Sequence, residues 1–144
     1  MSDLIIVALD GSESSLRALD TAIELAAPLA KTLVLVHVID WSPFVIETFE
    51  ENEHRGAIRK NQVERATTEV VAPAEERAAA AGVTAQQEIL FGAPAEEIVK
   101  QAEAKAASAI IIGRTGRSRL ERMMYGSIAN KIIQISEVPV VVVP

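Results

Sequence analysis

The chain has 144 residues, of which 49% are apolar and 24% are charged, a balance typical of one soluble globular domain spanning residues 1–144. Its formal net charge of −6 argues against nucleic acid and anionic membranes as partners, because Lys and Arg supply that attraction. No cysteine is present, which excludes disulfides and thiol chemistry, and the lack of a signal-peptide start or a ~20-residue apolar run predicts a cytoplasmic protein.

The apolar pattern predicts strands and helices in alternation, beginning with a strand at 4–9 and a helix over 14–30. A second strand at 32–39 precedes a long Ala-rich helix over 55–81, which Gly82 can end in a left-handed conformation. The spacing of apolar residues in the first helix predicts a buried face made of Leu16, Leu19, Ile23, Ala26 and Ala30.

The second half of the chain continues this alternation. A polar strand at 83–91, expected at a sheet edge, is followed by a helix over 93–107 and a strand at 109–113. A last helix over 127–136 leads to a strand at 138–143. One side of the last helix is expected to carry Ile128, Ile132 and Ile135.

Regular alternation of strand and helix predicts an α/β fold, a doubly wound five-stranded parallel sheet with helices on both faces. Four of the strands are apolar throughout, as expected when both faces of a sheet are covered. The strand order 3-2-1-4-5 suits such a chain and places a reversal of winding between strands 1 and 4. Ligands of these folds bind beyond the carboxyl ends of the strands at that point. The loops 10–15 and 113–127 are expected there.

Residues 113–127 combine glycines with a large share of the positive charge. Four of the 14 Lys and Arg residues lie in this connection: Arg114, Arg117, Arg119 and Arg122. The segment also contains three glycines, Gly113, Gly116 and Gly126. Glycine leaves main-chain N–H groups open to an anion. With the Ser127 hydroxyl at a helix start, they predict a phosphate site, with Arg114 and Arg117 nearest because they flank Gly116. The alternatives are that Ser127 only caps its helix and that some of these arginines are a solvated surface.

Asp10 follows the first strand and has two interpretations that are compatible. Its carboxylate can accept hydrogen bonds from ribose hydroxyls or an adenine amine. Asp10-Gly11 is also a strong turn signal, and Ser12 is a plausible N-cap for the next helix. His37, among Val and Leu of the second strand, is predicted to be a packed, hydrogen-bonded residue without a chemical role.

Two further segments carry predictions about surfaces. Trp41, Phe44 and Phe49 gather in the connection after the second strand, where they form a lid, a ligand-facing wall or a partner surface, or cover the start of the long helix. The last strand, Val138–Val143, is a long apolar edge that favours pairing with another chain. It predicts a homodimer joined edge to edge.

Gly113-Arg114-Thr115-Gly116, nine residues, then Gly126-Ser127 resembles the G-x-x-G-(nine)-G-[S/T] signature of the universal stress protein family, and the resemblance extends along the whole chain. It implies the same sheet order and ATP at the reversal point, often with Mg²⁺ or Mn²⁺ on the phosphates. Asp10 would contact adenosine, with Ala8 and the main chain of Val38 near the base. The residues implied around ribose and phosphates are Gly113, Arg114, Gly116, Gly126, Ser127 and Ile128. Small residues are common in the family at the position of Arg114, which leaves AMP and cyclic AMP as alternatives to ATP.

The sequence therefore predicts a cytosolic adenine-nucleotide-binding protein of stress response or signalling, which acts by binding and loop ordering rather than as an enzyme. No lysine-bearing phosphate loop and no dedicated catalytic residue stand out, although slow ATP hydrolysis by phosphate positioning is compatible with the sequence. The alternative is an interaction protein whose arginine loop docks an acidic partner. A dinucleotide oxidoreductase is disfavoured because the first loop lacks G-x-G-x-x-G, and a phospho-acceptor receiver because the last strand is followed by no lysine.

Overall fold

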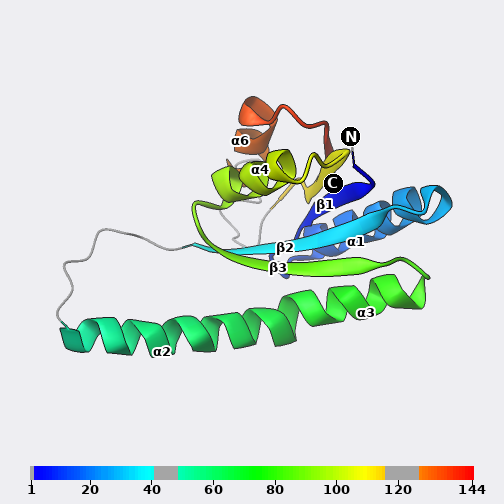
Figure 1. The fold of residues 1–144 in the computed structure, drawn as a ribbon. Helices are drawn as coiled ribbons and strands as arrows, with labels where there is room; N and C mark the ends of the chain where they lie inside the picture. The colour runs from blue at the N-terminus through cyan, green and yellow to red at the C-terminus, as the bar shows by residue number, and fades with distance from the viewer. Residues whose placement is uncertain (1, 41–48, 116–126) are drawn as a thin grey trace.

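The computed structural model describes residues 2–40, 49–115 and 127–144, and only the main chain of residues 49–55. Five parallel strands form one sheet in the order β3-β2-β1-β4-β5 (Figure 1). Their bounds are β1 Leu4–Ala8, β2 Thr32–Asp40, β3 Ala85–Gly92, β4 Ala109–Gly113 and β5 Val140–Val143. The predicted order is confirmed, and so are the edge positions of the polar third strand and the apolar last strand.

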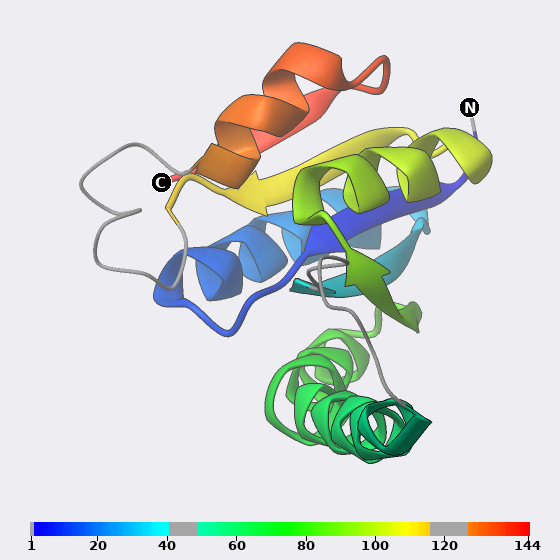
Figure 2. The ribbon, with the colours of Figure 1, turned by 90° about the vertical axis from the view of Figure 1, so that its left-hand side faces the viewer.

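Helices cover both faces of this sheet. Their bounds are α1 Glu13–Ala26, η1 Ala27–Leu29, α2 Phe49–Ala66, η2 Thr67–Val71, α3 Ala72–Ala80, α4 Pro94–Ala104 and α6 Ser127–Ile135. Helices α1 and α3 lie on one face and α4 and α6 on the other, while α2 extends beyond the end of the sheet (Figures 1 and 2). Within the described ranges, no helix is both long and apolar enough to cross a membrane.

Alternate residues of the strands belong to two separate hydrophobic cores, which explains why the central strands are apolar throughout. Val7 and Leu35 pack with α1 and α3 on one face, whereas Ile6, Val36 and Ile110 pack with α4 and α6 on the other. The side chains of consecutive strand residues point to opposite faces. A strand with helices on both sides therefore has no solvent-facing positions, and a polar residue at any position of the strand would be buried.

The long helix differs from its prediction over 55–81. It begins at Phe49, six positions earlier, and a π-helical turn interrupts it at Thr67–Val71. The cause is Pro73, which has no N–H and whose ring would clash with a carbonyl in a regular α-helix. The wider turn, in which Ala72 N–H bonds to Thr67 O, lets the helix continue past the proline. Gly82 then ends α3 with φ +77°, as predicted.

Two apolar faces predicted from spacing were partly wrong. Leu16 of α1 is 41% exposed and Ala30 is exposed, whereas Leu19 and Ala26 are buried as expected. In α6, Ile132 is fully buried but Ile135 is 38% exposed. The buried side of α1 consists of mostly small residues: Ser14, Ser15, Ala18, Leu19, Ala22 and Ala26. Small side chains let this side of α1 approach the sheet closely, and Leu16, which does not lie on this side, is exposed.

Gly113 shows how close that approach is. A Cβ at this position would lie 2.4 Å from Ser14 Oγ and 2.7 Å from the main-chain carbon of Ser14. Real Cβ atoms essentially never come so near to main-chain atoms, so any larger residue here would push α1 away from β4. Gly113 was predicted as part of a phosphate site, and helix packing alone already requires it to be glycine.

We expect Gly113→Ala to lower the free energy of unfolding by about 1–3 kcal/mol, because the added methyl group overpacks the α1–β4 contact. Gly56→Ala is the control, since nothing lies within 4 Å of a Cβ at that helical position. It should leave stability unchanged or raise it by up to ~1 kcal/mol. Urea unfolding measures both, and a Gly113→Ala midpoint equal to that of the wild type would contradict the packing argument.

Candidate functional site

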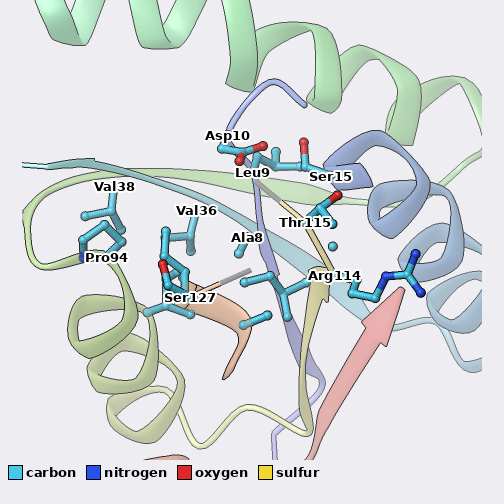
Figure 3. Close-up of a pocket in the computed structure, with 15 residues that line it drawn as sticks. Ala8, Leu9, Asp10, Ser15, Val36, Val38, Pro94, Arg114, Thr115 and Ser127 are labelled. Atoms are coloured by element: carbon cyan, nitrogen blue, oxygen red, sulfur yellow. The ribbon is translucent and has the colours of Figure 1, made fainter. Parts of the chain in front are cut away.

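A cavity opens at the carboxyl edge of the sheet, where the chain leaves β1 and β4 (Figure 3). The empty space between its walls, together with open solvent at its mouth, amounts to about 570 Å³. Its walls are formed by Ala8, Leu9, Asp10, Ser15, Val36, Val38, Pro94, Ile98, Ile112, Gly113, Arg114, Thr115, Ser127, Ile128 and Ala129.

Seven residues that the sequence predicted for the site line this one cavity: Ala8, Asp10, Val38, Gly113, Arg114, Ser127 and Ile128. Asp10 and Ser127 are more than a hundred positions apart in the chain, and the sheet order brings them together. Gly116, Arg117 and Gly126 lie outside the described residues. So do Arg119, Arg122, Trp41 and Phe44, and of Phe49 only the main chain is described.

Sequence reasoning missed several wall residues, among them Ser15, Pro94, Ile98 and Thr115. Pro94 begins a helix directly after a strand, and every such start lies at the same edge of a parallel sheet. Ile98 follows one turn later on the same side of α4. Thr115 stands between two glycines of the signature already noted. The signal for these residues was therefore present in their positions.

The loop after β1 holds Asp10 in a defined turn. Asp10 Oδ1 accepts a hydrogen bond from Ser12 N–H at 2.9 Å, and Gly11 adopts φ +81°. Ser12 caps α1 by accepting from Ser15 N–H at 3.1 Å, as predicted. The hydroxyl of Ser15 in turn donates to Ser12 O at 2.9 Å. The turn function of Asp10 is thus confirmed, and the turn fixes the carboxylate at the cavity wall.

Three helices begin at this cavity. The first turns of α1, α4 and α6 contribute Ser15, Pro94 and Ser127 to its walls. Each helix start carries unpaired N–H groups and the positive end of the helix dipole. Together they create a positive potential at one place in a chain whose net charge is −6, so an anionic group is favoured there.

The walls differ from one side of the cavity to the other. Val38 and Pro94 form an apolar side, and Thr115 and Arg114 lie on the opposite side, with Asp10 and Ser127 above and below in Figure 3. The guanidinium of Arg114 extends away from Val38, and its main-chain N–H donates to Val143 O at 2.6 Å beside the end of β5. The cavity thus suits a ligand with one apolar part and one polar part.

An ion pair joins helices α4 and α6. Lys131 Nζ of α6 lies 3.2 Å from Glu96 Oε1 in the first turn of α4. The pKa of Glu96 is lowered, first by its own main-chain N–H at the helix start and then by Lys131. Both side chains are half-exposed, so the pair contributes little to overall stability. The pair lies near two of the three helix starts that border the cavity, those of α4 and α6.

The sheet order and the cavity at the winding reversal define a doubly wound α/β domain of the kind that binds ligands beyond its strand ends. Residues 1–144 match the model of the universal stress protein family, and the chain belongs to that family. It is 38% identical to universal stress protein MJ0531 of Methanocaldococcus jannaschii, over 96% of this chain and 80% of that protein. It is 34% identical to universal stress protein YxiE of Bacillus subtilis, over 99% of both.

Solved structures agree with the observed architecture. The structure of the M. jannaschii protein MJ0577 matches with a TM-score of 0.84 and 28% identity, over 99% of this chain and 96% of that one. A universal stress protein in complex with cyclic AMP matches with a TM-score of 0.68 and 25% identity, over 98% of this chain and 96% of that one.

We expect the stability advantage of the wild type over Glu96→Gln to depend on pH. Because the pKa of Glu96 is lowered in the folded chain, its contribution is present above the 4.5 usual for glutamate. The contribution is lost as the pH falls through the lowered pKa. Urea midpoints at about pH 7 and about pH 3 measure this difference, which should be small at the first and smaller still at the second. A difference of equal size at both pH values would contradict the assignment.

Proposed function

We propose that this protein binds an adenine nucleotide in the cavity between β1, β4 and the starts of α1, α4 and α6. The observation that carries the proposal is the meeting of Asp10, Val38 and Ser127 at one cavity beneath three helix starts. A carboxylate, an apolar wall and a concentration of unpaired N–H groups match a ribose, a base and a phosphate. The cyclic AMP complex of a related structure supports the same ligand class.

Each part of the nucleotide has a matching wall. The base would lie against Val38 and Pro94, with Ala8 beneath it. Asp10 would accept hydrogen bonds from the ribose, because its turn already presents the carboxylate at the cavity. Ser127 and Thr115 would donate to phosphate oxygens. By the family signature, Gly116 and Gly126 would surround the phosphates, with Gly113 and Ile128 beside them. Arg117 would lie near the phosphates because it adjoins Gly116.

ATP is the first choice of ligand, with AMP or cyclic AMP as the alternatives. The side chain of Arg114 extends toward β5, so it leaves the ribose side open and can meet a phosphate tail that reaches the cavity mouth. Asp10 is the one acidic residue among the described cavity walls, and no cluster of three metal-binding side chains occurs in the described ranges. Mg²⁺ or Mn²⁺ would therefore be held mainly by phosphate oxygens and water, a mode that Mg²⁺ commonly adopts.

The action we propose is binding without dedicated turnover, in a cytoplasmic protein of stress response or signalling. Among the described wall residues, no second carboxylate, histidine or lysine is placed to activate water. Nucleotide would change the order of the loop that carries the signature, and a downstream protein partner would read that state. The alternative is an interaction protein in which the same arginine-rich connection binds an acidic partner and no nucleotide.

A thermal-shift titration with ATP, AMP and cyclic AMP, each with and without Mg²⁺, tests the proposal. At about 100 times its dissociation constant a ligand adds ~2.7 kcal/mol, which raises the Tm of a chain this size by roughly 5–10 °C. Asp10→Asn should keep the turn, because an amide oxygen still accepts from Ser12 N–H, yet weaken binding about 10- to 100-fold.

Asp3→Asn is the matched control, since Asp3 precedes β1 at the opposite edge of the sheet and is paired only loosely with Lys31 at 3.9 Å. It should bind as the wild type does. If no adenine nucleotide shifts the Tm, the nucleotide proposal is wrong and the interaction protein is favoured. Unchanged binding by Asp10→Asn would show that Asp10 has no contact with the ligand.

We also propose that the protein forms a homodimer through its last strand, Val138–Val143. β5 is an edge of the sheet, and its four valines are only partly buried in the single chain. Ile133 and Ile135 of the neighbouring helix α6 are 47% and 38% exposed. An apolar edge flanked by exposed isoleucines is a surface that a second copy of the chain would cover.

Hydrogen bonding within the sheet indicates where to interrupt this edge. Ile110 N–H bonds to Pro139 O and Arg114 N–H to Val143 O, so in a parallel ladder the main chain of Val142 faces away from β4. Val142→Pro should therefore remove an outward N–H without breaking the sheet, and should give monomers by light scattering. Val142→Thr keeps the N–H and should remain dimeric. A dimer of Val142→Pro that is as stable as the wild-type dimer would reject this interface.

A further inference from the structure

His37 makes a hydrogen bond that none of the proposed binding contacts requires. It lies in β2, two positions after Leu35, with its side chain on the face that packs against α1 and α3. Its Nδ1 is 2.7 Å from the carbonyl oxygen of Leu9, the residue between β1 and Asp10. A carbonyl oxygen only accepts, so Nδ1 carries the hydrogen whether the imidazole is neutral or protonated.

The bond from His37 to Leu9 O takes the place of a main-chain hydrogen bond between β1 and β2. Leu9 N–H donates to Val36 O at 2.8 Å, and the β1–β2 ladder ends at the pair Ala8–Val36. In a parallel ladder the next bond would run from Val38 N–H to Leu9 O. Between these two described residues no such bond forms, and the imidazole of His37 supplies the donor to that oxygen instead.

This replacement of one hydrogen-bond donor by another affects the wall of the cavity. The main-chain groups of Val36 face β1, and those of Val38 face the same way, because alternate residues of a strand bond to the same neighbour. β1 has ended at this level, and Val38 is part of the cavity wall. Within the described part of the chain, the N–H of Val38 therefore has no main-chain partner on the side where β1 and β2 part.

We propose that His37 is a positioning residue of the nucleotide site. Its Nδ1–H holds the Leu9 carbonyl in place of the Val38 N–H, which keeps that N–H available to a ligand and fixes the main chain before Asp10. The inference rests on the proposed function for its ligand, an adenine base whose ring nitrogens can accept from an open main-chain N–H. The bond itself belongs to the protein without ligand and can be tested there.

Two measurements by NMR need no nucleotide. The nitrogen chemical shifts of His37 at neutral pH should show a protonated Nδ1, and a neutral ring protonated only at Nε2 would overturn the proposal. The Val38 N–H should exchange with solvent faster than the Val36 N–H, which belongs to the same strand and lies in the β1–β2 ladder. Equal protection of the two would also overturn it.

Variants test the effect on binding. His37→Leu replaces the imidazole with an apolar side chain of similar size that has no hydrogen-bond donor. This variant should bind adenine nucleotide about tenfold more weakly. His37→Asn places an amide N–H close to where Nδ1 stood and should restore the affinity to within about threefold. Such rescue distinguishes a lost donor from a disturbed core.

Ser108→Ala is the matched control. Its hydroxyl donates to Leu4 O at 3.1 Å, a side-chain bond to a carbonyl at the other end of the same strand β1. This variant should bind within about twofold of the wild type even if it is somewhat less stable. Wild-type affinity in His37→Leu, or no recovery in a folded His37→Asn, would overturn the proposal. If the wild type binds no adenine nucleotide, the proposed function fails, and the two NMR measurements still decide whether His37 displaces the Val38 bond.

Discussion

The helices that follow β1 and β4 lie on opposite faces of the sheet, and the cavity depends on this divergence. β1 leads into α1 on one face and β4 leads toward α6 on the other, although the two strands are direct neighbours. Because the two strands lead to helices on opposite faces, a crevice remains beyond their carboxyl ends. The starts of α1, α4 and α6 border it, which adds positive potential without any buried charge.

The same few residues at this edge take part in the packing of the fold and line the proposed binding site. Gly113 must be glycine because Ser14 lies against it, and it is also a wall of the cavity. Ser12 and Asp10 complete a turn and a helix cap, and that turn holds the proposed ribose contact. His37 bonds to Leu9 O and so leaves the neighbouring Val38 N–H open. A substitution here is therefore expected to change stability and affinity together unless, as in Asp10→Asn, the local hydrogen bond is kept.

Much of the fold and half of the site were predictable because they depend on local patterns. Continuous apolar strands separated by helices gave the parallel sheet, and turn residues placed Asp10 and Ser127 at strand and helix ends. The rest depended on contacts between distant segments. Leu16 is exposed because α1 packs against the sheet through its small residues, and Pro73 produced a π-helical turn in place of a regular helix. That Thr115 and Ile98 line one cavity depended on how the end of β4 and the start of α4 are placed at the carboxyl edge.

The sequence by itself determined which segments are strands, which edge of the sheet holds the loops of the candidate site, and the family that the glycine spacing resembles. These properties follow from periodicity and turn chemistry, which act over a few residues. Only the tertiary structure decided that a side chain of β2 bonds to the end of β1, that Arg114 extends toward β5, and that Gly113 is required by helix packing. Each of these depends on distances between segments far apart in the chain, and residue spacing carries no such distances.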